Sequence, residues 1–134
     1  MKVTIRQLLN ESKEYENQLD FRIVCGEKYL DKLINSNSIN RPGLNLFGYF
    51  EYFANDRVQI FGKGESSYVE KIINEGKYEF LEKFFTYDVP CCIFTTDFHI
   101  PTKFLEIAEK FKTPVLVSPK NTAFVIHAIL DLFD

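Results

Sequence analysis

The chain has 134 residues and a formal net charge of −3, with 46% hydrophobic and 26% charged residues. This length fits one domain, and the composition is that of a globular protein that buries its own core. The acidic balance argues against a nucleic-acid-binding protein and against one that binds an anionic membrane, since both need a basic face. With 14 Phe and no Trp, the core should be rich in phenylalanine.

The first half of the chain predicts one short helix followed by strands. Thr4 is a suitable N-cap, because apolar residues follow it at helical spacing. Alternation and β-forming residues predict strands over residues 19–25, 33–34 and 57–61.

The second half is more regular. Apolar residues at helical spacing predict helices over residues 65–74, 77–85 and 101–111, and a last helix capped by Asn121-Thr122. Two short apolar runs, over residues 90–96 and 114–117, are typical of buried strands. The resulting order of strand, two helices, strand, helix, strand, helix indicates an α/β fold with a small, mostly parallel sheet flanked by helices.

The three cysteines, Cys25, Cys91 and Cys92, form no CxxC motif. Their odd number and the adjacency of the last two favour reduced, mostly buried thiols in a cytoplasmic protein. Cys91 and Cys92 should face opposite sides of one strand, so they cannot chelate a metal together. We expect neither a signal peptide nor a membrane span, because no apolar run is long enough for either.

The stretch INRPGLNLFGYFEYFANDRVQIFGKGE, residues 39–65, is unusually dense in aromatic rings and glycines. Pro42-Gly43 is typical of a type II turn, in which proline fixes one φ and glycine takes a positive φ. Gly48 is a second point at which the chain can reverse.

Four aromatic residues in this stretch, Tyr49, Phe50, Tyr52 and Phe53, lie within five positions. They suit either a stacking platform for bases or sugars, or packing in a core or an interface, and the acidic balance favours packing. No single helical or strand face can bury all four, so we expect at least one to be exposed at a partner surface.

Two expectations concern the charges around the strand 57–61. Arg57 should be partly buried and bonded to a backbone carbonyl or to a carboxylate such as Asp56 or Glu65. The turn Gly62–Glu65 is either a strand-to-helix connection or an anion site, which Lys63 would favour and Glu65 would oppose.

Recognised catalytic patterns are absent from the sequence. The chain has no GxxxxGK[ST] phosphate loop and no GxGxxG dinucleotide motif. His99 is expected in a loop and His127 packed within a helix, and no nucleophile–histidine pair or metal-ligand cluster has a recognisable spacing. We therefore predict no catalytic residue, no metal site and no cofactor within this chain.

Three stretches together resemble the N-terminal domain of HPr kinase/phosphorylase. Its pattern INRPGL-x-L-x-GYF-x-YF, then x-x-RIQ-x-x-G-x-x-E, is similar to residues 39–65. VPCCIFTT resembles its P-C-I-I-x-T-R segment and TPVLVSPKNTAFV its P-V-L-x-S-x-x-x-T-x-x-F segment, and the opening VTIRQLLNE also fits. The first pattern matches at Asn40, Arg41, Pro42, Gly43, Leu44, Leu46, Gly48, Tyr49, Phe50, Tyr52, Phe53, Arg57, Gln59, Gly62 and Glu65.

The resemblance implies a longer parent enzyme. In that family a C-terminal P-loop domain phosphorylates a serine of the carrier protein HPr with ATP or pyrophosphate and Mg²⁺, and reverses the reaction with phosphate, in control of carbon catabolite repression and the sugar phosphotransferase system. The family's enzymes are homohexamers, and the N-terminal fold is similar to the substrate-binding domain of muramyl ligases. Two departures, Asp97 in place of a basic residue and Cys92 in place of isoleucine, weaken the expectation that this edge binds an anion.

The resemblance therefore predicts that residues 1–134 form a non-catalytic regulatory or assembly domain in the cytoplasm, without nucleic-acid or membrane partners. Its partners would be its own kinase domain and other subunits, through Tyr49, Phe50, Tyr52 and Phe53, with HPr as the partner of the parent enzyme. The alternative is a free-standing domain that binds a phosphorylated or nucleotide-linked metabolite, with Asn40, Arg41, Arg57 and Lys63 as anion contacts. An independent enzyme is a third, weaker hypothesis.

Overall fold

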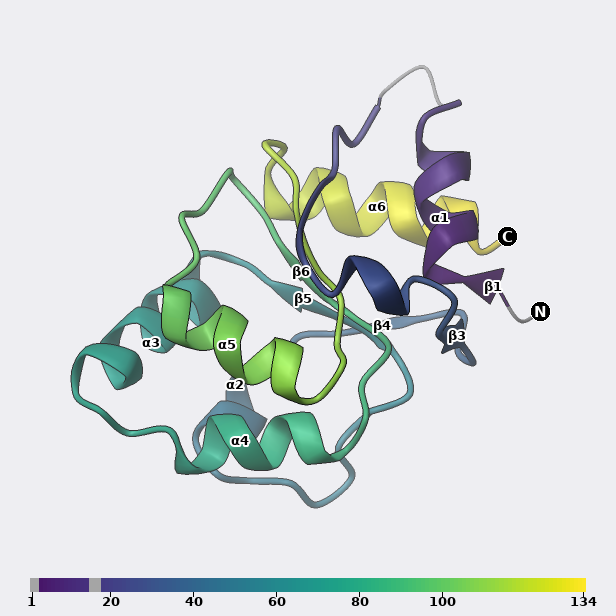
Figure 1. Ribbon diagram of the computed structural model, residues 1–134. Helices are drawn as coiled ribbons and strands as arrows, with labels where there is room; N and C mark the ends of the chain where they lie inside the picture. The colour runs from purple at the N-terminus through teal and green to yellow at the C-terminus, as the bar shows by residue number, and fades with distance from the viewer. Residues whose placement is uncertain (1–2, 15–17) are drawn as a thin grey trace.

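The computed structural model describes residues 3–14 and 18–134. A five-stranded sheet lies between two layers of helices: α1 and α6 cover one face, and α2 to α5 cover the other (Figure 1). The helices are α1 (Ile5–Ser12), η1 (Glu27–Tyr29, a 3₁₀ turn), α2 (Gly43–Leu46), α3 (Lys63–Asn74), α4 (Glu79–Thr86), α5 (Thr102–Lys110) and α6 (Thr122–Leu132). The strands are β1 (Val3–Thr4), β2 (Arg22–Cys25), β3 (Leu33–Ile34), β4 (Ile39–Asn40), β5 (Val58–Phe61), β6 (Cys92–Phe94) and β7 (Val115–Val117).

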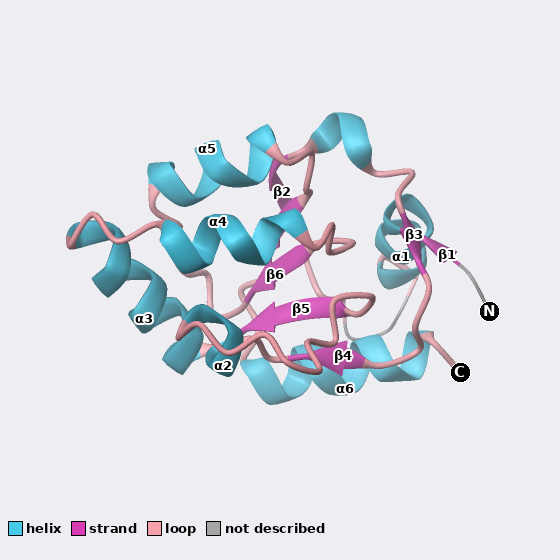
Figure 2. Cartoon of the chain, turned by 90° about the horizontal axis from the view of Figure 1, so that it is seen from below, coloured by secondary structure: helices cyan, strands magenta, loops and turns pink. Residues whose placement is uncertain are grey.

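The strand order in the main sheet is β2-β7-β6-β5-β4. Strands β4 to β7 are parallel, and β2 joins the β7 edge in the antiparallel direction. Figure 2 shows the central strands side by side above α6. β1 and β3 form a separate antiparallel pair. The α/β fold with a small, mostly parallel sheet is thus confirmed.

Each central strand is buried on both faces, as its continuous apolar run predicts. In β6, Cys92 and Phe94 face α2 to α5, and Ile93 and the preceding Cys91 face α1 and α6. This alternation confirms that the two adjacent cysteines point to opposite sides of the sheet.

A cluster of five fully buried phenylalanine rings fills the space between the sheet and the larger helical layer. Neighbouring ring centroids lie 4.4 to 6.0 Å apart in stacked and edge-to-face contacts, which aromatic pairs favour. The rings come from two strands and two helices: Phe61, Phe84, Phe85, Phe94 and Phe104.

One polar side chain, Gln59, is fully buried within β5. Its Nε2 donates to the carbonyls of Ala54 and Arg57, both at 2.9 Å, and its Oε1 accepts from Asn40 Nδ2 at 2.8 Å. The amide therefore fixes the loop before β5 and ties β5 to the edge strand β4. Its burial is tolerated because its polar atoms have partners.

The type II turn predicted at Pro42-Gly43 is wrong. Gly43 does not have a positive φ; it begins the short helix α2 instead, with Pro42 before it. The left-handed positions of this stretch come later, at Gly48 (φ 107°) and Tyr52 (φ 61°). Gly48 is required there for a second reason, since a Cβ would lie 2.7 Å from the ring of Phe80.

Element boundaries differ from the prediction by a few residues, mainly at helix starts. α3 begins at Lys63, because Gly62 acts as its N-cap, and α4 begins at Glu79. The strand predicted over residues 19–25 is formed only over Arg22–Cys25.

We predict that Gln59→Leu destabilises the fold by about 2–4 kcal/mol, because it removes the side-chain donor to the half-buried carbonyls of Ala54 and Arg57 and the acceptor of Asn40 Nδ2. Urea unfolding followed by circular dichroism measures the change. Asn10→Leu, on the exposed face of α1, is the control and should shift the free energy of unfolding by less than about 0.5 kcal/mol. Equal effects of the two variants would contradict the role given to Gln59.

The three thiols should differ in reactivity. Burial raises the pKa of Cys25 to about 11 and that of Cys91 to about 12, and it raises the pKa of Cys92 well above its usual value. Because the thiolate is the reactive form, we expect Cys25, which is only half-buried, to react first with an aromatic disulfide reagent, and Cys91 and Cys92 to react only on unfolding. A single fast phase for all three in the folded chain would refute this, with the urea-unfolded chain as the reference.

The same pKa shifts make stability depend on pH. The folded state keeps its thiol protons at pH values where the unfolded chain has lost them, so this contribution to stability is complete below the ordinary thiol pKa of 9.0. It is lost as the pH rises towards 11 and 12. Urea unfolding at increasing alkaline pH should show less of this loss in Cys91→Ala than in the parent chain.

Candidate functional site

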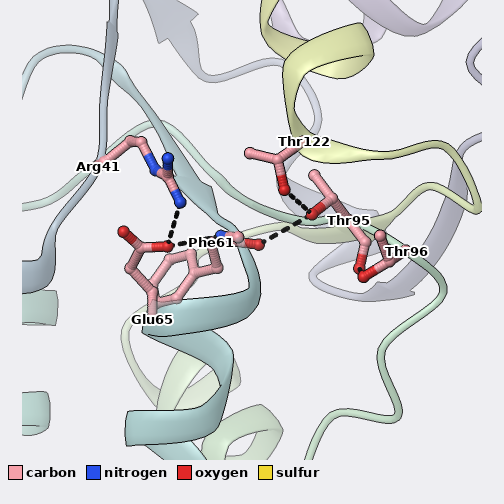
Figure 3. Close-up of polar contacts among 7 residues, drawn as sticks. Arg41, Phe61, Glu65, Thr95, Thr96 and Thr122 are labelled. Atoms are coloured by element: carbon pink, nitrogen blue, oxygen red, sulfur yellow. Dashed lines mark hydrogen bonds and ion pairs between the residues drawn. The ribbon is translucent and has the colours of Figure 1, made fainter.

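The carboxyl ends of the parallel strands are the first place to look for a site, because open α/β sheets place ligands there. β5 ends at Phe61 and leads through Gly62 into α3, while β6 ends at Phe94 and is followed by Thr95. The N-terminus of α6 lies at the same edge, since Thr122 contacts Thr95 (Figure 3).

A carboxylate of the chain itself occupies the N-terminus of α3. Glu65 Oε1 accepts a hydrogen bond from the backbone N–H of Gly62 at 2.8 Å and from Arg41 Nη2 at 2.9 Å. The Glu65 side chain is only 12% exposed, whereas that of Arg41 is 45% exposed. A helix N-terminus and a guanidinium together attract an anion, and Glu65 supplies that negative charge internally. The bonds of Glu65 are therefore structural. Of the two alternatives predicted for the turn Gly62–Glu65, the structure shows the strand-to-helix connection.

The residues around the Arg41–Glu65 pair are closely packed. A Cβ on Gly62 would lie 2.3 Å from Arg41 Nη2 and 3.0 Å from Thr122 Oγ1, so a side chain there would displace the Arg41 guanidinium from its place beside Glu65. The hydroxyls of Thr95 and Thr122 lie 2.7 Å apart, and Thr95, which is 1% exposed, also reaches the carbonyl of Phe61 at 3.4 Å. The cluster satisfies its polar atoms within the chain (Figure 3).

The turn after β6 departs from ordinary backbone geometry. Thr96 and Asp97 have φ values of 55° and 53°, which is rare for a β-branched residue. Asp97 Oδ1 lies 2.7 Å from Arg22 Nη2 on the antiparallel edge strand. Where the family pattern has a basic residue, this chain thus has an acidic one whose charge is balanced by Arg22.

The structure gives the four predicted anion contacts different roles and does not bring them together at one site. Arg41 pairs with Glu65, and Lys63 is exposed at the first turn of α3. Asn40 donates to Gln59 and Arg57 donates to the carbonyl of Ile39 at 3.4 Å, so both hold β4 against β5. The half-buried position of Arg57 and its carbonyl contact are as predicted.

The four predicted interface residues differ in exposure. Tyr49 and Tyr52 are 51% and 92% exposed, which confirms that at least one ring of the group remains outside the core. Phe50 and Phe53 are half-buried and pack on Tyr87.

Sequence reasoning missed two further exposed apolar side chains. Leu44 and Phe47 are 69% and 66% exposed, on and just after α2. Phe47 stacks on Tyr68 of α3, with ring centroids 4.3 Å apart. No local signal could have found them, because their exposure depends on the helix that begins at Gly43, where the sequence predicted a turn.

The histidines carry no recognisable chemistry. His99 lies exposed in a loop, as predicted, whereas the packed position predicted for His127 is wrong, because it lies on the exposed face of α6.

Over residues 3–14 and 18–134, no group of three or more His, Cys, Asp or Glu side chains could hold a metal ion. None of the helices in this part of the chain is both long and apolar enough to cross a bilayer.

Comparison with known proteins places the chain in a family. The model of the HPr Serine kinase N terminus matches residues 3–133. HPr kinase/phosphorylase of Treponema pallidum (strain Nichols) is 42% identical over 102 residues, which are 76% of this chain and 32% of the relative. The enzyme of that name from Leptospira biflexa (strain Patoc 1 / Ames) is 36% identical over 132 residues, which are 98% of this chain and 40% of the relative.

A solved structure supports the fold alone. The CBS and DRTGG domains of the regulatory region of Clostridium perfringens pyrophosphatase, complexed with the activator diadenosine tetraphosphate, match with a TM-score of 0.57 at 12% identity. The match covers 95% of this chain and 45% of that one. The family match over residues 3–133 and the relatives, of whose length the chain spans 32% to 40%, lead to one assignment. The chain belongs to the HPr kinase/phosphorylase family and corresponds to its N-terminal domain.

Proposed function

We propose that this chain is a non-catalytic regulatory and assembly domain of an HPr kinase/phosphorylase, and that it acts through an exposed apolar surface. The observation that supports this most directly is the exposure of four large side chains that follow one another along a short segment. We call this surface the α2 face: Leu44, Phe47, Tyr49 and Tyr52.

Exposed apolar side chains clustered in this way are typical of protein–protein contact. Large aromatic side chains lose little conformational freedom when a partner covers them, and they supply much of the binding energy of such contacts. Two of the three rings of the α2 face also have contacts within the chain before binding: Phe47 is stacked on Tyr68, and Tyr49 Oη donates to Glu51 at 3.3 Å. A surface that is already ordered loses less entropy on association.

The carboxyl edge of the sheet gives less support to a catalytic or phosphate-binding role. The N-terminus of α3 is occupied by Glu65, and the two arginines described at this edge, Arg41 and Arg22, are paired with Glu65 and Asp97. The sequence also has no phosphate loop. In the parent enzyme, ATP or pyrophosphate, Mg²⁺ and HPr would all be bound by a kinase domain, and the α2 face would contact that domain or another subunit of a hexamer. The buried reduced thiols favour the cytoplasm as the compartment.

Phosphate transfer is tested directly. We expect the purified chain, incubated with HPr, Mg²⁺ and either ATP or pyrophosphate, to yield no phosphoserine on HPr by intact-protein mass spectrometry. The Leptospira biflexa HPr kinase/phosphorylase, under the same conditions, serves as the positive control. Transfer that co-purifies with the chain and persists after a second chromatographic step would overturn the non-catalytic assignment.

Assembly is tested by sedimentation at increasing concentration. We expect weak self-association of the isolated chain, and we expect Phe47→Ser combined with Tyr52→Ser to weaken it by about tenfold or more, which is about 1.4 kcal/mol of association free energy. Leu130→Ser is the matched control, because Leu130 is a comparably apolar, 36% exposed residue on α6, in the other helical layer.

Two results would contradict the assembly role. One is a strict monomer whose sedimentation is the same for the parent chain and for the α2-face variant. The other is an equal loss of association in Leu130→Ser, which would indicate non-specific stickiness rather than a defined face.

A further inference from the structure

A hollow of about 620 Å³ lies among α2, the end of α3 and the start of α4. Figure 2 shows these three helices together on one side of the sheet. The volume is in the range of small-molecule sites, which is roughly 300–1,000 Å³. The hollow is separate from the polar cluster at the carboxyl edge, because none of its lining residues belongs to that cluster.

The walls of the hollow are aromatic and aliphatic. Tyr68, Tyr78 and Phe80 supply rings, and Leu46 and Ile72 supply aliphatic surface. No hydrogen bond among the described residues uses the hydroxyl of Tyr68 or Tyr78, so both are free to bond to a ligand. A site with apolar walls and a few free polar groups suits a flat ring that carries hydrogen-bonding atoms.

The shape of the hollow is fixed by its surroundings. The ring of Phe80 lies so close to Gly48 that a Cβ there would be 2.7 Å away, and Tyr68 is held by its stack with Phe47. Gly76, with a φ of 70°, lets the chain turn from α3 towards α4 and leaves the space between them open. The walls are therefore in place before any ligand arrives.

Charge decides which ring compounds fit. The charged lining residues are Lys77, Glu79 and Glu82. Lys77 lies 3.0 Å from Glu75, and Glu82 lies 3.9 Å from Lys110, whereas no cation of the described residues lies within 4.0 Å of the Glu79 carboxylate. The lining thus has two carboxylates and one lysine, and this negative balance disfavours an anionic ligand relative to a neutral or cationic one.

A ring of the same hollow already accepts a cation. Lys103 Nζ lies 5.0 Å from the centroid of Tyr78, which is within the range of a cation–π contact. Aromatic walls beside a carboxylate are the chemistry by which proteins recognise organic cations.

We propose that this hollow binds a flat aromatic compound that is neutral or positively charged and carries no anionic group. This ligand class differs from the phosphorylated or nucleotide-linked metabolite that the sequence suggested as an alternative. The proposed site, at the α3–α4 junction, also differs from the one suggested around Arg41 and Lys63. The inference goes beyond the proposed assembly role and does not depend on it.

Three indole compounds test the proposal, because they share one ring and differ in charge: tryptamine, indole and indole-3-acetate. The chain has no tryptophan, so indole fluorescence excited at a wavelength that tyrosine does not absorb reports the ligand, and its anisotropy measures binding to the full chain. We expect saturable binding of tryptamine and indole, and at least about tenfold weaker binding of indole-3-acetate, a difference of about 1.4 kcal/mol.

Two pairs of variants locate the ligand. Phe80→Ala removes one wall and should weaken indole binding by at least about fivefold, whereas Tyr52→Ala, outside the hollow, should leave it unchanged. Glu79→Gln should reduce the preference for tryptamine over indole-3-acetate and leave indole binding intact, whereas Glu70→Gln, exposed on α3, should not. Circular dichroism confirms that each variant is folded.

The proposal is overturned by any of four results. These are no saturable binding of indole, equal or tighter binding of indole-3-acetate, unchanged indole affinity in a folded Phe80→Ala chain, and an undiminished charge preference in Glu79→Gln. The sedimentation test of the α2 face is a separate measurement, so a failure here leaves the assembly role standing, and the converse also holds.

Discussion

The contact on which the rest of the structure depends is the cluster of five buried phenylalanine rings between the sheet and the α2–α5 layer. Phe61 and Phe94 come from adjacent strands, Phe84 and Phe85 from α4, and Phe104 from α5. Each ring touches at least one ring from another element, so the cluster fixes the position of every element it joins. Losing a buried ring of this kind typically costs about 3–5 kcal/mol, a large part of the total stability of a domain this size.

Phe61 is the last residue of β5, which leads through Gly62 into α3, so the cluster also places the start of α3 near Arg41, the residue after β4. Arg41 then meets Glu65, and Glu65 meets the N–H of Gly62. The place where a parallel α/β sheet commonly holds an anion is therefore filled by the chain's own carboxylate. The open surface of the domain lies elsewhere, on α2 and at the α3–α4 junction, where rings that the core cannot cover face outward.

The two surfaces adjoin each other. Phe47 of the α2 face stacks on Tyr68, which lines the hollow, and Gly48 lies against Phe80, which forms another wall. A contact that moved α2 would change the shape of the hollow, because Leu46 of α2 lines it and Gly48 lies against Phe80. The geometry thus allows a ligand and a partner to influence each other without any route through the sheet.

The sequence by itself determined the α/β class and the order of elements from residue 57 onward, because continuous apolar runs and helical spacing are local signals. The family followed from the resemblance carried by the motif of residues 39–65. It also determined that the four neighbouring aromatics could not all be buried, since no single helical or strand face presents every one of five consecutive positions. Only the tertiary structure decided which rings are outside: α2 begins where a turn was predicted, and the left-handed backbone at Gly48 and Tyr52 sends Tyr49 and Tyr52 outward while Phe50 and Phe53 pack on Tyr87. It likewise decided that Arg41 pairs with Glu65 and that no cation among the described residues lies within 4.0 Å of Glu79. These outcomes depend on distances between residues far apart in the chain, and no local pattern carries that information.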